Sequence, residues 1–237
     1  KLGFTGRIVL IGDEDFLPYK RPPLSKAYLS GTVTEDKLLV TQEAGVTKLN
    51  ITGRQGLSAT RIDRNHKLSH LTDGTTQAYD QLVLATGGRA RLLTLPGGDL
   101  PAVLPLRNIA DVKAIRALCG NDRRVAIVGG GFIGLEVAAV LRKQNMDVTV
   151  LEGQDRVLAR VTSPTVSAFF ERVHREAGVD VRTGVAVSGF KLDGEVTTVD
   201  LGNDGSVDAH LVVTGIGLIP NTELAAEAGL AVDNGIV

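Results

Sequence analysis

Three glycines at a fixed spacing are the strongest chemical signal in the sequence. Gly129, Gly131 and Gly134 follow a short apolar run and lead into a segment with helical periodicity. At such a junction the first glycine makes the tight turn, the second lets backbone approach a pyrophosphate, and the third lets helix pack on strand. The first helical residues, Phe132 and Ile133, then offer amide hydrogens to the phosphates. The spacing therefore predicts a dinucleotide site.

A carboxylate at the expected distance supports this interpretation. Glu152 closes the next predicted strand about 20 residues after the glycines, where an acid binds the ribose hydroxyls of NAD. A carboxylate there repels a 2′-phosphate, and the adjacent Gly153 supplies no cation, so NADH is the expected nucleotide. Arg156 is near enough in sequence to keep NADPH open as the alternative. A glycine-rich turn without a ligand is the plainer interpretation of the same residues.

The elements around these residues follow a strand–helix–strand order. The hydrophobic pattern and the turn residues predict a strand at 124–128, a helix at 132–144, a strand at 147–151, a helix from Pro164 that stops at Gly178, an antiparallel meander with turns at 193–194 and 203–205, and a strand at 211–215. Such an order is typical of a parallel sheet with helical crossovers.

Two acids in the first half of the chain also follow a predicted strand directly, as Glu152 does in the second half. The apolar run at 7–12 predicts a strand buried on both faces, and Asp13 and Glu14 follow it as Glu152 follows the later strand. Residues 1–4 are typical of a helix end. A second nucleotide-binding unit, whose first strand and glycine loop precede residue 1, would explain these features together. A surface acidic turn is the alternative.

The remaining first half contains short elements. Its pattern predicts short strands between 50 and 80 with turns at 65–66 and 73–74, a buried strand at 80–88, and a helix at 108–119. Cys119 falls on the apolar face of that helix, which predicts a buried core thiol. Gly120-Asn121-Asp122 is the best candidate for a domain boundary.

Composition excludes several classes of protein. The chain has 237 residues, of which 43% are hydrophobic and 22% charged, and its net charge is −1. These values are those of a globular protein and supply no field for nucleic acid or an anionic membrane, so we expect neither as a partner. No apolar run approaches the roughly 20 residues of a membrane helix. A single cysteine suits a reducing cytoplasm, and the four histidines show no metal-ligand spacing, so no metal is expected.

Five segments, in order, are similar to a known family. They are LIGDE at 10–14, LPYKRPPLSK at 17–26, LATGG at 84–88, GGGFIGLE at 129–136 and GIGLIPN at 215–221. Together they resemble the FAD-dependent ferredoxin reductases of the putidaredoxin reductase type, which belong to the pyridine nucleotide-disulfide oxidoreductase superfamily. The resemblance runs essentially from end to end, and PPLSK together with GFIGLE makes it specific.

The resemblance implies an α/β fold with two Rossmann-like dinucleotide-binding domains of the three-layer ββα type, the NAD domain being inserted into the FAD domain. Residues 1–120 would be a partial FAD-binding domain that lacks the first strand and glycine loop, and 121–237 a nearly complete NAD-binding domain. NADH would deliver a hydride to FAD, which would pass single electrons to a [2Fe–2S] ferredoxin serving an oxygenase system. We expect this chain alone to bind FAD weakly or not at all and to have little reductase activity.

The resemblance also implies roles for individual residues. Asp13 or Glu14 would hold the adenosine ribose of FAD, and Lys26 would lie beside the isoalloxazine ring. Glu136 would face the nicotinamide and could pair with Lys26. The further cofactor contacts that it implies are Ala59, Thr86, Gly87, Arg107 and Gly217. Without the resemblance, Lys26 is a solvated loop lysine and Glu136 an exposed acid near a helix start.

Missing cysteines decide the branch of the superfamily. Disulfide reductases carry a redox-active cysteine pair in the first domain, and peroxide-reducing relatives carry one cysteine there. This chain has Ser25-Lys26 in that neighbourhood and no cysteine before Cys119, so electrons would leave from the flavin. Two alternatives stay open: the flavoprotein portion of an NADH-dependent nitrite reductase, and an NADH-sensing flavoprotein of the apoptosis-inducing-factor type.

Overall fold

The structure is a computed structural model that describes residues 3–237, and its chain divides into two compact units. Unit 1 comprises Lys1–Lys20, Glu35–Arg89 and Ile219–Val237, and unit 2 comprises Arg21–Thr34 and Ala90–Leu218. The long segment of unit 2 is thus inserted into unit 1, as the resemblance implies for the two domains. The unit boundaries differ from the expected division after residue 120, because residues 103–105 pair with the later strand 211–214. Which unit binds which cofactor stays a prediction.

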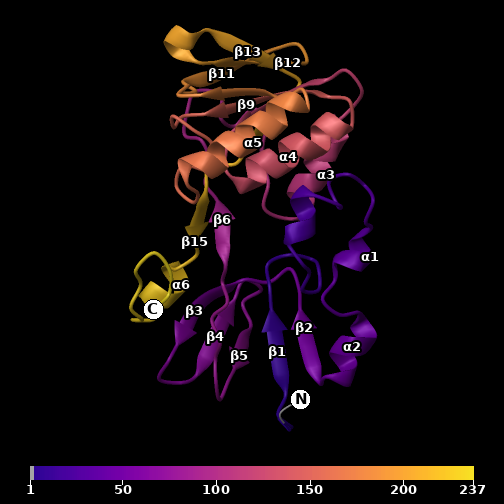
Figure 1. Ribbon diagram of the computed structural model, residues 1–237. Helices are drawn as coiled ribbons and strands as arrows, with labels where there is room; N and C mark the ends of the chain where they lie inside the picture. Colours follow the sequence, from indigo (N-terminus) through magenta and orange to yellow (C-terminus); the bar gives the residue numbers. More distant parts are fainter. Residues whose placement is uncertain (1–2) are drawn as a thin grey trace. The chain divides into compact units, whose positions relative to one another are not determined.

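A five-stranded parallel sheet forms the centre of unit 2 (Figure 1). Its strands, in spatial order, are β10 (Asp180–Thr183), β9 (Asp147–Glu152), β8 (Arg124–Val128), β14 (Leu211–Thr214) and β7 (Val103–Pro105). Helix α4 (Phe132–Lys143) connects β8 to β9. The predicted strand–helix–strand order of this segment is confirmed, with the strand bounds of β8 and the helix start at Phe132 as expected.

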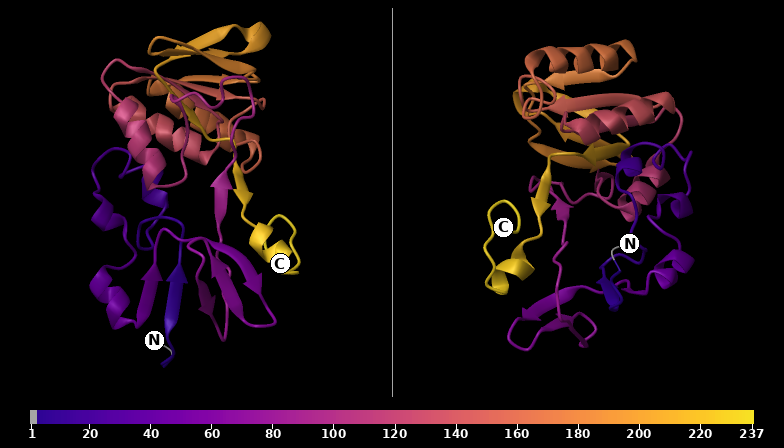
Figure 2. Two further views of the ribbon diagram at one scale, coloured as in Figure 1. Left: turned by 180° about the vertical axis from the view of Figure 1, so that it is seen from behind. Right: turned by 60° about the horizontal axis from the view of Figure 1, so that its bottom comes forward.

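The two faces of this sheet carry different layers. Helices α3 (Ile109–Leu118), α4 and α5 (Pro164–Glu176) lie beside one another in Figure 1. An antiparallel meander of β11 (Gly189–Asp193), β12 (Val196–Asp200) and β13 (Ser206–Ala209) covers the other face, and Figure 2 gives further views of it. Within β8, Ile127 faces α4, whereas Ala126 and Val128 join Phe190 and Val199 of the meander in one apolar cluster. Both faces are buried, so the strand is apolar from Val125 to Val128.

Helix starts in unit 2 follow their sequence signals. Asn108 Oδ1 accepts the Asp111 N–H over 2.9 Å and Asp111 Oδ2 accepts the Asn108 N–H over 3.0 Å, which closes a capping box before α3. Helix α5 starts at the predicted Pro164, and Gly178 lies just past its end with φ of +87°. No helix among the described residues is long and apolar enough to span a lipid bilayer.

Unit 1 contains two small sheets. Strands β1 (Ile8–Ile11) and β2 (Ile51–Arg54) pair in parallel, and β3 (Ala59–Asp63), β4 (Leu68–Leu71) and β5 (Thr76–Ala78) form an antiparallel sheet with turns at the predicted places. The short helices are α1 (Glu35–Leu38), α2 (Glu43–Lys48) and α6 (Glu223–Glu227). The remaining elements of the chain are the two-stranded sheet of β6 (Gly88–Ala90) and β15 (Leu218–Pro220) and the 3-10 helices Pro22–Ser25 and Gly202–Asp204.

Several predictions for apolar segments were wrong. The expected strand at 80–88 does not form over 81–87, because no described strand completes a hydrogen-bond ladder with it, and Val83 is 85% exposed. Strand β1 forms as predicted but is not buried on both faces, since Leu10 is 42% exposed. Cys119 lies just after α3 and is half-buried, and burial raises the pKa of its thiol. The predicted helix end at 1–4 includes residues 1–2, which lie outside the described residues.

Candidate functional site

The register of the parallel sheet brings the fingerprint residues to one edge. Val128 stands opposite Leu151 of β9 and opposite Thr214 of β14, so the residues that follow these three positions emerge together. The Gly129 N–H donates to Leu151 O over 2.8 Å, and the Gly215 N–H donates to Val128 O over 2.8 Å. This edge holds the carboxyl ends of the strands, where open α/β sheets bind ligands.

Two of the fingerprint glycines are required by close packing. Gly129 has φ of +110°, and a Cβ there would lie 2.6 Å from Gly215 O. A Cβ on Gly134 would lie 2.0 Å from Gly129 O, within the turn that joins β8 to α4. Only glycine fits at either position without backbone movement, so these two residues bring α4 directly against the sheet.

Gly131 is a glycine for a different reason. It occupies the N-cap position of α4 with extended backbone, and a Cβ there would meet no atom within 4 Å. Packing among the described residues therefore does not explain this glycine. Phe132 and Ile133 follow in the first turn and are 50% and 43% exposed. The amino end of this twelve-residue helix is thus open, with N–H groups and the positive end of its dipole available to an anion.

Glu152 is held against the glycine loop. Its Oε2 accepts the Gly130 N–H over 2.6 Å, and its Oε1 accepts the Gln154 N–H over 2.8 Å. The carboxylate is half-buried at the end of β9. Each carboxylate oxygen can accept more than one hydrogen bond, so these contacts orient the group and leave acceptor capacity for ribose hydroxyls.

A second constellation of unit 2 joins the loop at 21–34 to α4. Lys26 Nζ lies 2.6 Å from Glu136 Oε2, and the Ser25 hydroxyl donates to the same oxygen over 2.5 Å. Lys26 Nζ also donates to Pro22 O over 3.4 Å. The ion pair that the resemblance allowed between Lys26 and Glu136 is therefore present, and the buried Ser25 adds a partner that the sequence did not indicate.

In unit 1 the two acids after β1 have different surroundings. Glu14 Oε2 accepts the Tyr19 hydroxyl over 2.5 Å and is half-buried, whereas Asp13 is exposed. Between β1 and these acids, Gly12 has no atom within 4 Å of the place where a Cβ would stand. The end of β1 therefore has open space beside Asp13. Gly131 in unit 2 has similar open space.

Asn221 organises the backbone at Thr86 and Gly87. The Asn221 side-chain amide donates to Thr86 O over 3.0 Å, the Thr86 hydroxyl donates to Asn221 O over 2.5 Å, and the Asn221 N–H donates to Gly87 O over 3.0 Å. Arg89 donates to Asn221 Oδ1 and to Glu223 Oε1, each over 2.8 Å. The matched segments LATGG and GIGLIPN thus meet within unit 1 through one asparagine, although sequence analysis gave Asn221 no role.

The remaining predicted contact residues are Ala59, Arg107 and Gly217. Ala59 opens β3 opposite Leu71. Arg107 precedes α3, and its N–H donates to Asp111 Oδ2 over 2.7 Å while its carbonyl accepts from Arg21 Nη1 over 3.0 Å. Gly217 has φ of +119° and its carbonyl accepts the Arg91 N–H over 3.0 Å. Their contact with a cofactor stays a prediction.

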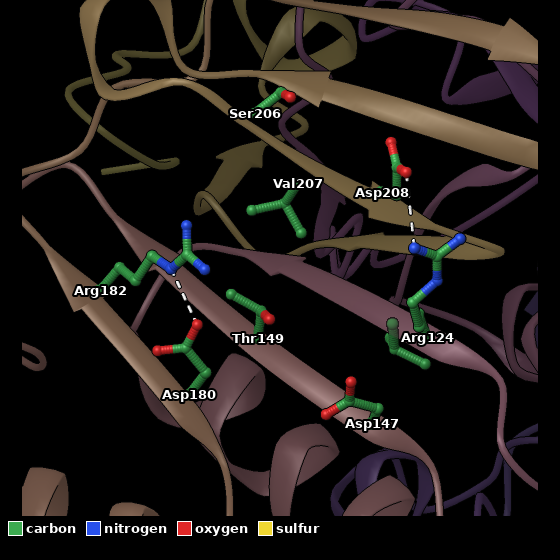
Figure 3. Close-up of a pocket in the computed structure, with 9 residues that line it drawn as sticks. Arg124, Asp147, Thr149, Asp180, Arg182, Ser206, Val207 and Asp208 are labelled. Atoms are coloured by element: carbon green, nitrogen blue, oxygen red, sulfur yellow. Dashed lines mark hydrogen bonds and ion pairs between the residues drawn. The ribbon is translucent and has the colours of Figure 1, made fainter.

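A cavity of about 360 Å³ lies at the opposite edge of the parallel sheet, by the first residues of β8, β9 and β10 (Figure 3). Four of its five charged side chains form two pairs: Arg124 with Asp208 over 3.4 Å, and Arg182 with Asp180 over 2.8 Å. Within 3–237, no group of three or more His, Cys, Asp and Glu residues is arranged so that it could hold a metal ion. The glycine loop, rather than this cavity, is therefore the candidate site.

Comparisons with known proteins agree with this geometry. The family described as pyridine nucleotide-disulphide oxidoreductase matches residues 2–237. Putidaredoxin reductase CamA from Pseudomonas putida is 48% identical over 241 residues, covering 99% of this chain and 57% of the relative. Rhodocoxin reductase from Rhodococcus erythropolis is 43% identical, covering 99% and 55%. The chain thus spans a little over half the length of these relatives.

Solved structures give the same result. The covalent putidaredoxin reductase–putidaredoxin complex aligns with a TM-score of 0.92 at 46% identity, covering 98% of this chain and 57% of that one. The ferredoxin reductase for the CYP199A2 system from Rhodopseudomonas palustris aligns with a TM-score of 0.94 at 39% identity, covering 99% and 58%. The expected α/β fold class with Rossmann-like units is therefore confirmed. The chain belongs to the pyridine nucleotide-disulphide oxidoreductase family and is similar to its ferredoxin reductases.

Proposed function

We propose that unit 2 binds NADH at the edge formed by Gly129, Gly131 and Glu152. The observation that carries this proposal is the unfilled space at Gly131, in front of the amino end of α4 and beside a carboxylate. The pyrophosphate accepts N–H groups from Gly131, Phe132 and Ile133, while the ribose hydroxyls donate to Glu152. Gly134 contributes indirectly, because it allows α4 to approach the strand.

We further propose that the protein containing this chain binds FAD. Asp13 or Glu14 holds the adenosine ribose at the end of β1, where the space beside Gly12 fits a ligand. The proposed contacts with the rest of the cofactor are Lys26, Ala59, Thr86, Gly87, Arg107 and Gly217. FAD, when bound, accepts a hydride from the nicotinamide and releases its electrons singly. The ammonium of Lys26 would stabilise the negative charge of the reduced flavin ring. Glu136 holds that ammonium in place.

The proposed activity is that of an NADH-dependent ferredoxin reductase. Its electron acceptor is a [2Fe–2S] ferredoxin that serves an oxygenase system, and its compartment is the cytoplasm. Support comes from similar proteins, which include a ferredoxin–NAD(+) reductase subunit of a benzene 1,2-dioxygenase system from Pseudomonas putida. One solved relative is a complex with putidaredoxin. The absence of a cysteine before Cys119 is consistent with electrons leaving from a flavin.

The experiment uses the intact protein that contains this chain, reconstituted with FAD. Rapid NADH-dependent reduction of a [2Fe–2S] ferredoxin, with sulfite and nitrite inert as acceptors, is the expected result. A slow reaction that accumulates a long-lived complex of reduced flavin with NAD would contradict the reductase proposal and favour the sensor class. Failure to retain FAD at all would contradict the flavoprotein assignment.

A further inference from the structure

The guanidinium group of Arg156 makes three hydrogen bonds to the chain that follows it. Arg156 Nη1 donates to Thr162 O over 3.0 Å and to Ser167 Oγ over 2.7 Å, and Nη2 donates to Ala159 O over 2.9 Å. These bonds join the end of the β9 segment to the start of α5. Arg156 is half-buried, so it is placed as a structural donor and not as a solvated cation.

The turn that Arg156 closes holds a residue in an unusual conformation. Leu158 has φ of +55°, which a side chain with a Cβ rarely adopts, and it is 3% exposed. The Thr162 hydroxyl donates to Leu158 O over 3.2 Å, and the buried Ser167 hydroxyl donates to Val157 O over 2.6 Å. Surrounding bonds therefore maintain a backbone geometry that an isolated loop would not keep.

This geometry reaches the glycine loop directly. The Leu158 N–H donates to Gly130 O over 3.0 Å, while the Gly130 N–H donates to Glu152 Oε2 over 2.6 Å. Gly130 is thus held at both its carbonyl and its amide. A Cβ on Gly130 would stand 3.0 Å from Val157 Cγ1 and 3.1 Å from Glu152 Cβ, so the loop and the turn also pack closely.

We propose that Arg156 is a positioning residue for the dinucleotide loop and not the cation that would recognise a 2′-phosphate. By closing the turn at 156–162, it places the Leu158 N–H on Gly130 O and so fixes the loop at Gly129–Gly131. A 2′-phosphate that bound Nη1 of Arg156 would compete with Thr162 O and Ser167 Oγ for the same donors. These bonds argue against the alternative that the sequence left open, in which Arg156 selects NADPH. This inference rests on the proposed nucleotide site.

Arg156→Lys is the deciding variant, because it keeps the positive charge but cannot donate to three fixed acceptors. Calorimetric titration of this chain with NADH and NADPH measures both dissociation constants. We expect Arg156→Lys and Arg156→Gln to raise the dissociation constants for NADH and NADPH by the same factor, about tenfold. A loss of this size corresponds to one hydrogen-bonded contact. Arg172→Gln is the matched control, since Arg172 pairs only with Glu176 and stacks on Phe169, and it should leave both constants unchanged.

Amide hydrogen exchange provides a readout that needs no nucleotide. The Leu158 N–H should exchange at least about tenfold faster in Arg156→Lys than in the unsubstituted chain, and should be unaffected in Arg172→Gln. Selective loss of NADPH binding in Arg156→Gln, with retention in Arg156→Lys, would overturn the proposal. Unfolding of both Arg156 variants would also contradict it, because the proposed role is confined to one turn. Failure of the unsubstituted chain to bind either nucleotide, with Leu158 exchange behaving as expected, would instead refute the proposed function.

Discussion

Lys26 and Glu136 form an ion pair within unit 2, with Nζ 2.6 Å from Oε2, and Ser25 donates to that same oxygen. The Lys26 side chain is 50% exposed and the Glu136 side chain 31% exposed, so water screens their attraction. Exposed pairs of this kind contribute about 0–1 kcal/mol to stability. The arrangement is therefore better suited to fixing the position of two charged groups than to holding the fold together.

Glu136→Gln should separate these two roles. We expect the free energy of unfolding to change by no more than about 1 kcal/mol, because the lost pair is screened. In the intact protein, kcat/KM for NADH should fall by about tenfold, because the lysine that we propose lies beside the flavin loses its anchor. Thermal unfolding and NADH-dependent reduction of a dye measure the two effects. Glu195→Gln, which alters an 81% exposed side chain, is the control and should change neither.

Gly131→Ala and Gly134→Ala form a matched pair that distinguishes ligand space from packing. Gly134→Ala should destabilise the chain by about 2–3 kcal/mol, because its Cβ would stand 2.0 Å from Gly129 O. Gly131→Ala should keep the unfolding midpoint within about 3 °C, because no atom lies within 4 Å of its Cβ. Its dissociation constant for NADH should nevertheless rise by about tenfold or more, because the methyl group would take the place that we propose for the pyrophosphate.

Thermal unfolding and calorimetric titration of both variants test this pair. Unchanged NADH affinity in a folded Gly131→Ala variant would show that the space at this residue is not used. Equal destabilisation by the two substitutions would show that Gly131 is needed for packing instead.

Gly153→Arg should shift nucleotide preference toward NADPH. The nearest atom to a Cβ at Gly153 is Val185 O at 3.8 Å, so a side chain fits there. An arginine beside Glu152 supplies the cation that a 2′-phosphate needs, and we expect the ratio of NADPH to NADH affinity to rise by about tenfold. Gly153→Gln, whose side chain is long and polar but uncharged, is the control, and both variants are titrated with NADH and NADPH. A shift of equal size in both variants would count against the charge explanation.

Asp63 should titrate well below its usual range. The His66 N–H donates to Asp63 Oδ1 over 3.0 Å, and this backbone bond, with a second bond from the His66 ring, lowers the pKa of the carboxyl from 3.8 to about 2. Because the folded-state pKa is depressed, the contribution of Asp63 to stability is present above pH 3.8 and is lost as pH falls toward 2.

Carbon NMR titration of the Asp63 carboxyl measures this directly. His66→Ala removes the ring but keeps the backbone donor, so the midpoint should rise only part of the way to 3.8. A midpoint of 3.8 in the unsubstituted chain would refute the turn geometry at 63–66.

The sequence predicts the glycine-loop unit well because its signals are local. The apolar run before Gly129, the helix start at Phe132 and the acid at Glu152 each depend on neighbours within one strand–helix–strand segment. Asn108 and Pro164 mark helix starts through their own side chains in the same way. Such elements carry their information in consecutive residues.

Features that depend on distant partners could not be predicted this way. The run at 80–88 is apolar enough for a strand, but a strand also needs a neighbour to complete its ladder, and periodicity does not report one. Ser25 meets Glu136 across 111 residues, and Asn221 meets Thr86 across 135. Arg156 has its partners close in sequence, yet only the folded turn shows that its guanidinium is already bonded.

Calorimetric titration of this chain with NADH, NADPH and FAD in parallel tests the central claim most directly. We expect saturable binding of one NADH per chain, at least about tenfold tighter than NADPH, with weak or absent FAD binding. Loss of the NADH signal in the folded Gly131→Ala variant would place it at the loop before α4. A folded chain that binds neither nicotinamide nucleotide, or that binds NADPH more tightly than NADH, would contradict the account.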